Sequence, residues 1–174
     1  MFYADGKPMP NYDLPKAAPE PLRRVQLLIN STDTEHGTEW LPDWLAERGL
    51  GVGELPRARD LREALRALVL ANNGVRLDPA SVRVLNDAAN GVRVEVSELA
   101  EVRVVSRGDA IDDVVAVALN AMVDGTWSRL KACRNCRWCF YDESPNRSAR
   151  WCSMQLCGNR KKTRAYRARK RARA

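Results

Sequence analysis

A cluster of five cysteines between residues 133 and 157 constrains the fold of this 174-residue chain more than any other feature. Two residues separate Cys133 from Cys136 and Cys136 from Cys139, while four separate Cys152 from Cys157. A structural zinc ion takes four thiolate or imidazole ligands in a tetrahedron, and a CxxC turn presents two thiolates to one ion at about 2.3 Å. The spacing therefore predicts one structural zinc ion held by two cysteine pairs, Cys133–Cys136 and Cys152–Cys157.

Two other interpretations of the cysteines remain open at this point. Cys139 lies in an apolar stretch and is assigned to packing, but a CxxCxxC triplet could recruit it as a ligand. Alternatively, the five cysteines could be buried or disulfide-bonded. The chain shows no cationic segment followed by an apolar core, so we expect no secretory signal and a reducing cytoplasm, where paired cysteines are more often metal ligands. No run approaches ~18 apolar residues, so we expect no membrane span.

The charge of the chain is divided unevenly along its length. Residues 1–128 carry 14 Lys/Arg against 20 Asp/Glu, a net charge of −6, whereas residues 129–174 carry 15 against 2, a net charge of +13. An acidic body followed by a strongly basic end suggests that the two parts meet different partners. The proline-rich residues 1–20 are interpreted as an extended arm.

The periodicity of apolar residues predicts a mainly helical body over residues 21–128. Helical spacing begins at Leu22. Further helices are expected in LPDWLAERGLG, DLREALRALVLANNG and DAIDDVVAVALNAMVDG. Another helix is expected to begin at Asp78-Pro79 and to bury Val82 and Leu85. Alternating valines predict an antiparallel hairpin at about residues 92–106. The fold class is therefore mainly α with a small β-hairpin (α+β), followed over residues 129–174 by a treble-clef-like zinc finger that ends in a basic helix.

The cations after the last cysteine favour a polyanionic partner. Residues 158–174 contain nine Lys/Arg and no acid. If a helix continues from Ser153, cations surround most of it and alanines form the narrow remaining face. Membrane binding would need large apolar residues on that face, and a solvated tail is the other alternative. Nucleic acid is favoured because the cations directly follow a rigid zinc module.

The stretch CRNCRWCFYDESPNRSARWCSMQLCGNRKK resembles the CGNR zinc finger, found at the C-terminus of a family of bacterial transcription regulators. The stretches RRVQLLINSTDTEHG and DLREALRALVLAN resemble the opening helices of that family's N-terminal ABATE domain. The resemblance implies that Cys133, Cys136, Cys152 and Cys157 bind zinc and that position 139 is apolar. Pro145 departs from the family's usual loop. The family further implies a DNA-binding finger and a helical domain that senses a ligand or stress.

We therefore expect a cytoplasmic DNA-binding transcription regulator, with an RNA- or ribosome-associated protein or a protein-interaction module as alternatives. A homodimer and a small-molecule effector are further expected partners. An enzyme is not expected, because His36 is the one histidine and lies in an acidic loop. Pocket candidates between the helices are Arg23, Asn30, Trp40 and Trp44, with core packing as the simpler role for Trp44. Nucleic-acid candidates are Arg147, Arg150, Asn159, Arg160, Lys161, Lys162, Arg164, Arg167, Arg169, Lys170 and Arg171.

Overall fold

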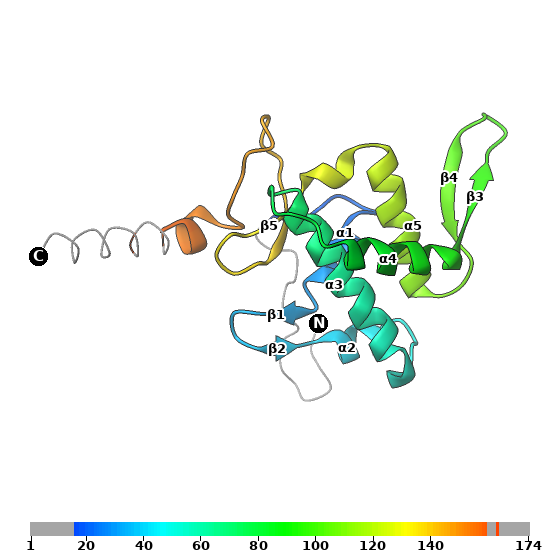
Figure 1. The fold of residues 1–174 in the computed structure, drawn as a ribbon, viewed down its shortest axis with the longest axis horizontal. Coiled ribbons are helices and arrows are strands. Elements are labelled where there is room, and N and C mark those ends of the chain that lie inside the picture. The colour runs from blue at the N-terminus through cyan, green and yellow to red at the C-terminus, as the bar shows by residue number, and fades with distance from the viewer. Residues whose placement is uncertain (1–15, 160–162, 164–174) are drawn as a thin grey trace, which may run out of the picture.

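Three helices form the centre of the body in the computed structural model, which describes residues 16–159 and Thr163 (Figure 1). They are α1 (Arg23–Ile29), α3 (Leu55–Ala71) and α5 (Ala110–Val123), and α1 contacts both of the others. Each helix turns aliphatic side chains inward at helical spacing, as the sequence predicts. The fully buried members include Val25, Leu28, Ile29, Leu61, Leu65, Ile111 and Val115.

Two further α-helices and three single 3-10 turns complete the described part of the body. They are α2 (Leu41–Ala46), α4 (Pro79–Ala88) and the single turns η1 (Val52–Glu54), η2 (Ala89–Gly91) and η3 (Thr126–Arg129). Asp78 begins α4 by accepting a hydrogen bond from the Ala80 N–H at 2.9 Å, the expected role of an N-cap carboxylate. Asp109 caps α5 in the same way, through the N–H groups of Ile111 and Asp112.

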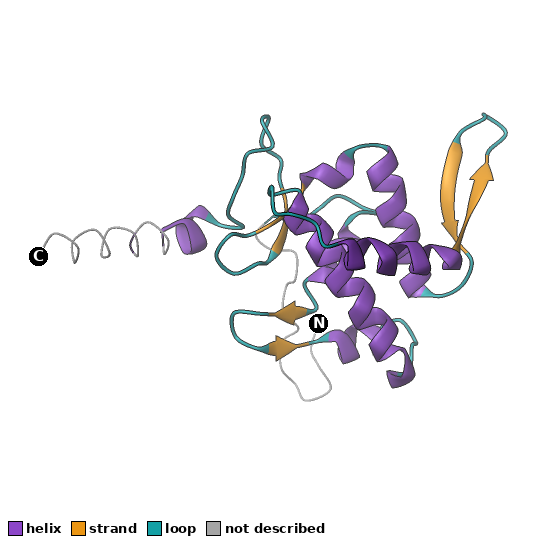
Figure 2. Ribbon diagram, viewed as in Figure 1, coloured by secondary structure: helices purple, strands orange, loops and turns teal. Residues whose placement is uncertain are grey.

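Three separate two-stranded antiparallel sheets accompany the helices (Figure 2). They pair β1 (Thr32–Asp33) with β2 (Thr38–Glu39), β3 (Val92–Val96) with β4 (Val102–Ser106), and β5 (Leu130–Ala132) with β6 (Cys139–Tyr141). The β3–β4 hairpin projects from the body at the opposite end from the cysteines (Figure 1). The β5–β6 pair is joined by the turn that carries Cys133 and Cys136, and it lies against α3 and α1.

The predicted fold class is confirmed: helices predominate, the sheets are small, and four cysteines gather in the C-terminal part. One predicted core residue is wrong, because the side chain of Val82 on α4 is 37% exposed whereas Leu85 is buried. The sheets β1–β2 and β5–β6 were not expected from the sequence. No helix within residues 16–159 is long and apolar enough to cross a membrane.

Asparagine side chains fix the β5–β6 pair to the body. On the α1 side, Asn30 is fully buried and exchanges two hydrogen bonds with the backbone of Cys139, both at 2.8 Å. After α3, Asn72 donates to the carbonyls of Trp127 and Leu130, and Asn73 accepts from the Ala132 N–H at 2.9 Å. The first cysteine pair is therefore presented by strands that are bonded to the helical core on two sides.

Candidate metal centre

The thiols of Cys133, Cys136, Cys152 and Cys157 converge on one point. Their sulfur atoms all lie within 4.8 Å of one another, and three of the separations are 3.6 to 3.7 Å. Four sulfurs at about 2.3 Å from a tetrahedral zinc ion lie about 3.8 Å apart, so the donor set fits zinc closely. A disulfide would need about 2.05 Å, and all five cysteines are free thiols. The four cysteines are therefore positioned to hold one structural zinc ion.

The first pair lies on a tight turn that leaves β5 and returns to β6. The Cys133 N–H donates to the Trp138 carbonyl at 2.9 Å, and the Arg137 N–H donates to the Cys133 carbonyl at 2.9 Å. This turn places Arg137 in the left-handed region, with φ of +61°, a conformation that usually selects glycine. The Arg137 side chain is exposed, while the Cys133 and Cys136 sulfur atoms both belong to the cluster of four.

The second pair flanks the start of a single π-helical turn, η4 (Met154–Gly158): Cys152 precedes the turn and Cys157 lies within it. The Ser153 carbonyl accepts hydrogen bonds from the N–H groups of both Cys157 and Gly158, at 3.1 and 3.0 Å. Gly158 is buried, and a Cβ atom there would come within 2.8 Å of the Met154 sulfur. A side chain at position 158 would therefore require the exposed Met154 side chain to move.

Hydrogen bonds among the four thiols favour negative charge on one of them, Cys133. The pKa of the Cys133 thiol is lowered below its usual range, mainly because the Cys136 and Cys152 thiols donate hydrogen bonds to it. The same interaction with Cys133 raises the pKa of Cys136 to about 12. Asn135, between the first two ligands, directs its side-chain N–H at the Cys157 sulfur from 3.7 Å. When zinc binds, all four thiols would lose their protons and surround one dication as thiolates.

Cys139 does not belong to the metal centre. It is fully buried, packs with the core of the helical body, and points away from the cluster of four thiols. Burial raises the pKa of its thiol to about 12, so it remains protonated at neutral pH. The interpretation of Cys139 as a packing residue agrees with this position.

A buried carboxylate organises the loop between the two cysteine pairs. Asp142 is 1% exposed and accepts hydrogen bonds from the N–H groups of Ser144 and Ala149, at 3.0 and 2.9 Å. Burial alone would raise the pKa of Asp142, but these hydrogen bonds and the nearby Lys16 ammonium outweigh that effect and lower the pKa. The carboxylate thus stays ionised and fixes the start of the loop that leads to Cys152.

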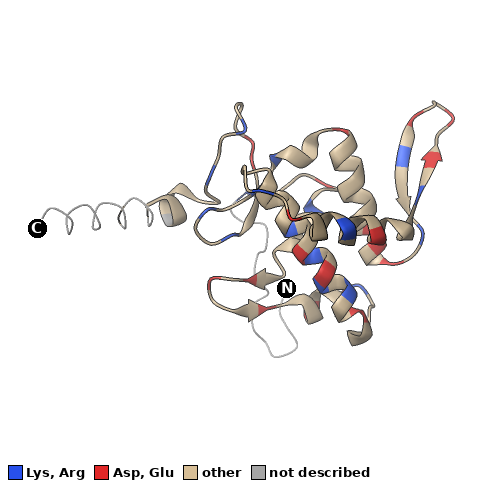
Figure 3. Cartoon of the chain, in the orientation of Figure 1, with Lys and Arg blue, Asp and Glu red and all other residues tan. Residues whose placement is uncertain are grey.

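Exposed arginines surround the metal centre. Arg134, Arg137, Arg147 and Arg150 are exposed, and none of them forms an ion pair with another described residue. Many arginines of the body are instead paired, such as Arg57 with Asp109 at 2.6 Å and Arg62 with Glu39 at 2.5 Å. Figure 3 shows this contrast, because basic positions recur along the loops of the finger while the body helices mix both signs.

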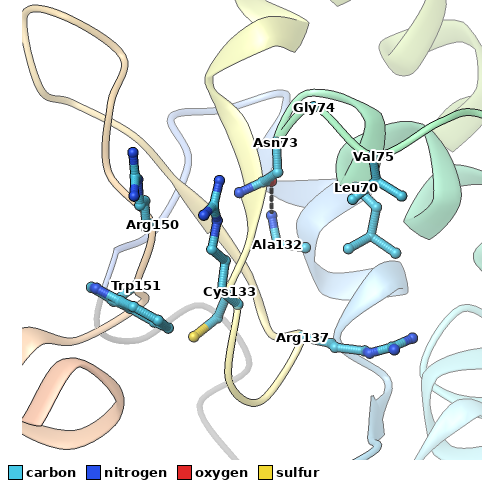
Figure 4. A pocket seen from close by; sticks show the side chains of 10 residues that line it. Leu70, Asn73, Gly74, Val75, Ala132, Cys133, Arg137, Arg150 and Trp151 are labelled. Carbon is cyan, nitrogen blue, oxygen red and sulfur yellow. Dashed lines mark hydrogen bonds between the residues drawn. The ribbon is translucent and has the colours of Figure 1, made fainter. Parts of the chain in front are cut away.

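Three of these arginines line a cavity of about 700 Å³ between the finger and the end of α3. Arg150 and Trp151 lie on one side of the cavity, Leu70 and Val75 lie on the other, and Arg137 extends along its lower edge (Figure 4). Arg134 is also part of the lining, and no carboxylate is. The cavity can therefore accept an anionic group.

The predicted pocket residues do not form this cavity. Asn30 and Trp44 are buried at 0% and 2% exposure, where Asn30 bonds to β6 and Trp44 packs in the body core. Neither Arg23 nor the half-buried Trp40 lines the cavity. His36 is exposed on the β1–β2 turn, with its Nδ1 atom 2.6 Å from the Asp33 carboxylate.

The nucleic-acid candidates are only partly within the described chain. Arg147 donates to the Ser128 hydroxyl at 2.6 Å, Arg150 lines the cavity, and Asn159 is exposed directly after η4. The predicted basic helix and its cations lie outside the described residues, namely Arg160, Lys161, Lys162, Arg164, Arg167, Arg169, Lys170 and Arg171. Arg134 and Arg137 were missed by sequence reasoning, although both stand beside ligand cysteines.

Two family models match the chain, and their matches meet at Arg129. A model described as "CGNR zinc finger" matches residues 129–170. The ABATE model, described as "Putative stress-induced transcription regulator", matches residues 23–129, more than half of the chain. No protein of curated function matches the chain.

Proposed function

The chain belongs to the ABATE family and carries a CGNR zinc finger, and we propose that it regulates transcription by binding duplex DNA through that finger. In this proposal the zinc ion holds the finger rigid, and cations on the finger and after it contact the phosphate backbone. The acidic body carries the regulatory role that the family description suggests, and the protein works in the cytoplasm beside bacterial DNA.

The observation that carries the proposal is the uncompensated positive charge of the finger. Four exposed arginines stand on the loops around the metal centre without a carboxylate partner among the described residues. The finger's two acids are the buried Asp142 and the exposed Glu143, so little negative charge competes with an external anion. Arginines left unpaired on a rigid module are well suited to phosphate, which they can bind in a bidentate manner.

The zinc ion would supply stability rather than chemistry. Four thiolates complete its tetrahedron and leave no coordination position for water or a substrate. The finger's own core is small, comprising Phe140 with the ligand cysteines and a few half-buried neighbours, among them Trp138 and Trp151. A core of this size depends on its metal for folding, so the arginines keep their arrangement only while zinc is bound.

The cavity beside Arg134, Arg137 and Arg150 offers a place for one phosphate or another anionic group at the junction of finger and body. Phosphate contacts position a protein on nucleic acid but do not read sequence. The arginines of the cavity are therefore assigned to affinity and orientation, while base recognition falls to residues that follow Gly158.

The test is a salt titration of binding by the zinc-loaded full chain to random duplex DNA and to structured RNA, with zinc measured on the same sample. We expect one zinc per chain and DNA binding that weakens steeply with salt, because counterions are released from the phosphates. The variants Arg134→Gln and Arg150→Gln should each lower the salt slope by about 1. Arg83→Gln, an exposed site on α4, is the matched control and should change nothing.

A preference for structured RNA would contradict the DNA proposal and favour the alternative of an RNA- or ribosome-associated protein. Binding of neither nucleic acid would leave the finger as a protein-interaction module. Equal salt slopes for the arginine variants and for Arg83→Gln would show that the arginines of the finger do not contact phosphate.

A further inference from the structure

The β3–β4 hairpin exposes several aliphatic side chains to solvent. Val94, Val96 and Val102 are 66%, 68% and 66% exposed, and Leu99 at the tip is 80% exposed. The hairpin packs on α5 near its base and projects beyond the helices (Figure 1). Exposed aliphatic residues on a protruding strand pair are typical of a surface that meets another chain.

The hydrogen-bond pattern shows which edge of the hairpin is open. The Ser97 N–H donates to the Glu101 carbonyl at 2.9 Å, and the Arg107 N–H donates to the Gly91 carbonyl at 2.8 Å. Backbone groups of successive residues alternate in direction along an antiparallel strand. The odd-numbered residues of β3 therefore face β4, and Val92, Val94 and Val96 direct their N–H and C=O groups away from it.

The opposite edge of the hairpin is already closed. Asn120 on α5 accepts a hydrogen bond from the Val104 N–H at 3.0 Å and donates one to the Val104 carbonyl at 2.8 Å. No third strand pairs with β3 in the part of the chain that the structure describes. The outer edge of β3 is consequently the side of the hairpin at which a further strand can be added.

The sequence of β3 is complementary to itself. It reads Val-Arg-Val-Glu-Val, with Val94 at the centre and opposite charges at equal distances on either side. An antiparallel copy centred on Val94 would place Arg93 of each chain opposite Glu95 of the other, and Val92 opposite Val96. Shifting the centre to Arg93 or to Glu95 would set like charges against each other, which destabilises the pairing. One register is therefore favoured, and the favoured occupant of this edge is a second copy of the same strand.

We propose that the chain forms a homodimer in which β3 of each copy pairs antiparallel with β3 of the other, centred on Val94. The result is a continuous four-stranded sheet in the order β4, β3, β3, β4. Each hairpin tip, with its exposed Leu99, then lies toward the base of the other copy's hairpin. This pairing does not involve the finger, so it is independent of the proposed binding to DNA.

The first test is sedimentation of the zinc-loaded full chain without nucleic acid, over a range of concentrations. Arg93→Glu leaves two acids on each β3, and Glu95→Arg leaves two bases, so each variant should raise the dimer Kd roughly tenfold or more. The exchange Arg93→Glu with Glu95→Arg should restore the homodimer. Mixing the two single variants should give a heterodimer, because both charge pairs across the interface then join opposite charges.

Glu101→Arg is the matched control. It makes the same change of charge in the turn of the same hairpin, at a residue outside β3. It should leave the dimer Kd unchanged, and every variant should keep the circular dichroism of the parent. A parent chain that stays monomeric at the highest concentration reached would overturn the proposal. A dimer whose Kd is the same in the parent, the single variants, the control and the mixture would also overturn the proposal, because its interface would not include β3.

Hydrogen exchange provides a second and local readout. The amides of Val94 and Val96 should become protected as concentration rises in the parent chain, and they should stay unprotected in Arg93→Glu. The Val104 amide, which is bonded to Asn120, should be protected equally in both. Protection at Val94 that does not change with concentration would contradict pairing between copies.

Discussion

At the scale of single residues, an asparagine supports the metal centre without binding the metal. Asn135 directs an N–H at the Cys157 sulfur from 3.7 Å, which stabilises negative charge on that ligand. We expect Asn135→Ala to weaken zinc affinity by about tenfold, the lower end of the usual effect of losing such a partner. Competition with a chromogenic chelator would measure it. Asn146→Ala, in the exposed loop between the cysteine pairs, is the control, and equal affinities would remove Asn135 from the site.

A second asparagine joins the finger to the helical body. Replacing Asn30 by Ala would leave the buried N–H of Cys139 without its partner and remove one of the two donors to its carbonyl. Because a buried backbone group left unsatisfied costs about 1–3 kcal/mol, we expect the free energy of unfolding to fall by about 2 kcal/mol. Urea denaturation would measure the change. Asn90→Ala, at an exposed site, should cost less than about 0.5 kcal/mol, and similar losses in both would contradict the role of Asn30.

The metal ligands could be predicted from the sequence, whereas the structural roles of Asn30 and Asn135 could not. The ligands are recognisable because zinc demands four thiolates at short and regular spacing. Asn30 was instead considered for a ligand pocket, since a polar residue on a helix gives no indication that its partner is the backbone of Cys139, 109 positions away. Asn72 and Asn73 stand at the end of the predicted helix DLREALRALVLANNG, and their bonds to η3 and β5 likewise depend on tertiary contacts.

At the scale of elements, the finger and the body have separate cores, so loss of the metal should affect them differently. The finger's cluster holds Cys133, Phe140, Cys152 and Cys157, whereas Cys139 belongs to the body's cluster. We expect Cys157→Ser to abolish stoichiometric zinc binding and to expose Trp138 and Trp151, with a red shift of fluorescence. The helical circular dichroism of the body should persist, because α1, α3 and α5 pack on one another.

Cys139→Ala is the matched control for that variant. It removes a thiol that lies three to eighteen positions from the other cysteines but is not part of the metal site, so one zinc per chain should remain. Its cost should instead appear as about 1 kcal/mol of lost body stability, because a buried sulfur atom is removed from a packed core. Loss of zinc in Cys139→Ala, or full zinc content in Cys157→Ser, would contradict the assignment of the four ligands.

The helices and strands that could be predicted from the sequence are those whose apolar pattern repeats over many residues. The helices α3 and α5 repeat their apolar residues over several turns, β3 alternates valine with charged residues over five positions, and β4 begins with the same alternation. The strands β1, β2, β5 and β6 have two or three residues, too few to establish a period of two. Val82 fits the helical spacing of α4 and is nonetheless exposed, since periodicity defines a face but not what covers the end of that face.

At the scale of the whole molecule, the separation of charge matches the separation of roles that we propose. Many arginines of the body form ion pairs with its acidic residues, whereas the exposed arginines of the finger form none with described residues. The hairpin and the finger project at opposite ends of the molecule (Figure 1). Pairing through β3 would therefore leave both fingers open, and two fingers related by a twofold axis would suit a DNA site with two half-sites.

The last prediction concerns the cations that follow the finger. Deleting residues 161–174 removes eight Lys/Arg and none of the four ligand cysteines. We expect the truncated chain to keep one zinc and to lose binding to DNA at physiological salt, because each lost phosphate contact reduces the counterion release that drives association. Measuring zinc content and a salt titration on the same sample would separate the two effects.

A full-length variant with the same eight cations changed to Gln tests whether charge or chain length is responsible. It should match the truncation, because phosphate binding depends on the cations. If binding survives both changes, the arginines around the metal centre must supply the affinity, and Arg134→Gln with Arg150→Gln should then abolish it. If binding survives only in the Gln variant, the backbone or the alanines of residues 161–174 make the contact, and the electrostatic proposal fails.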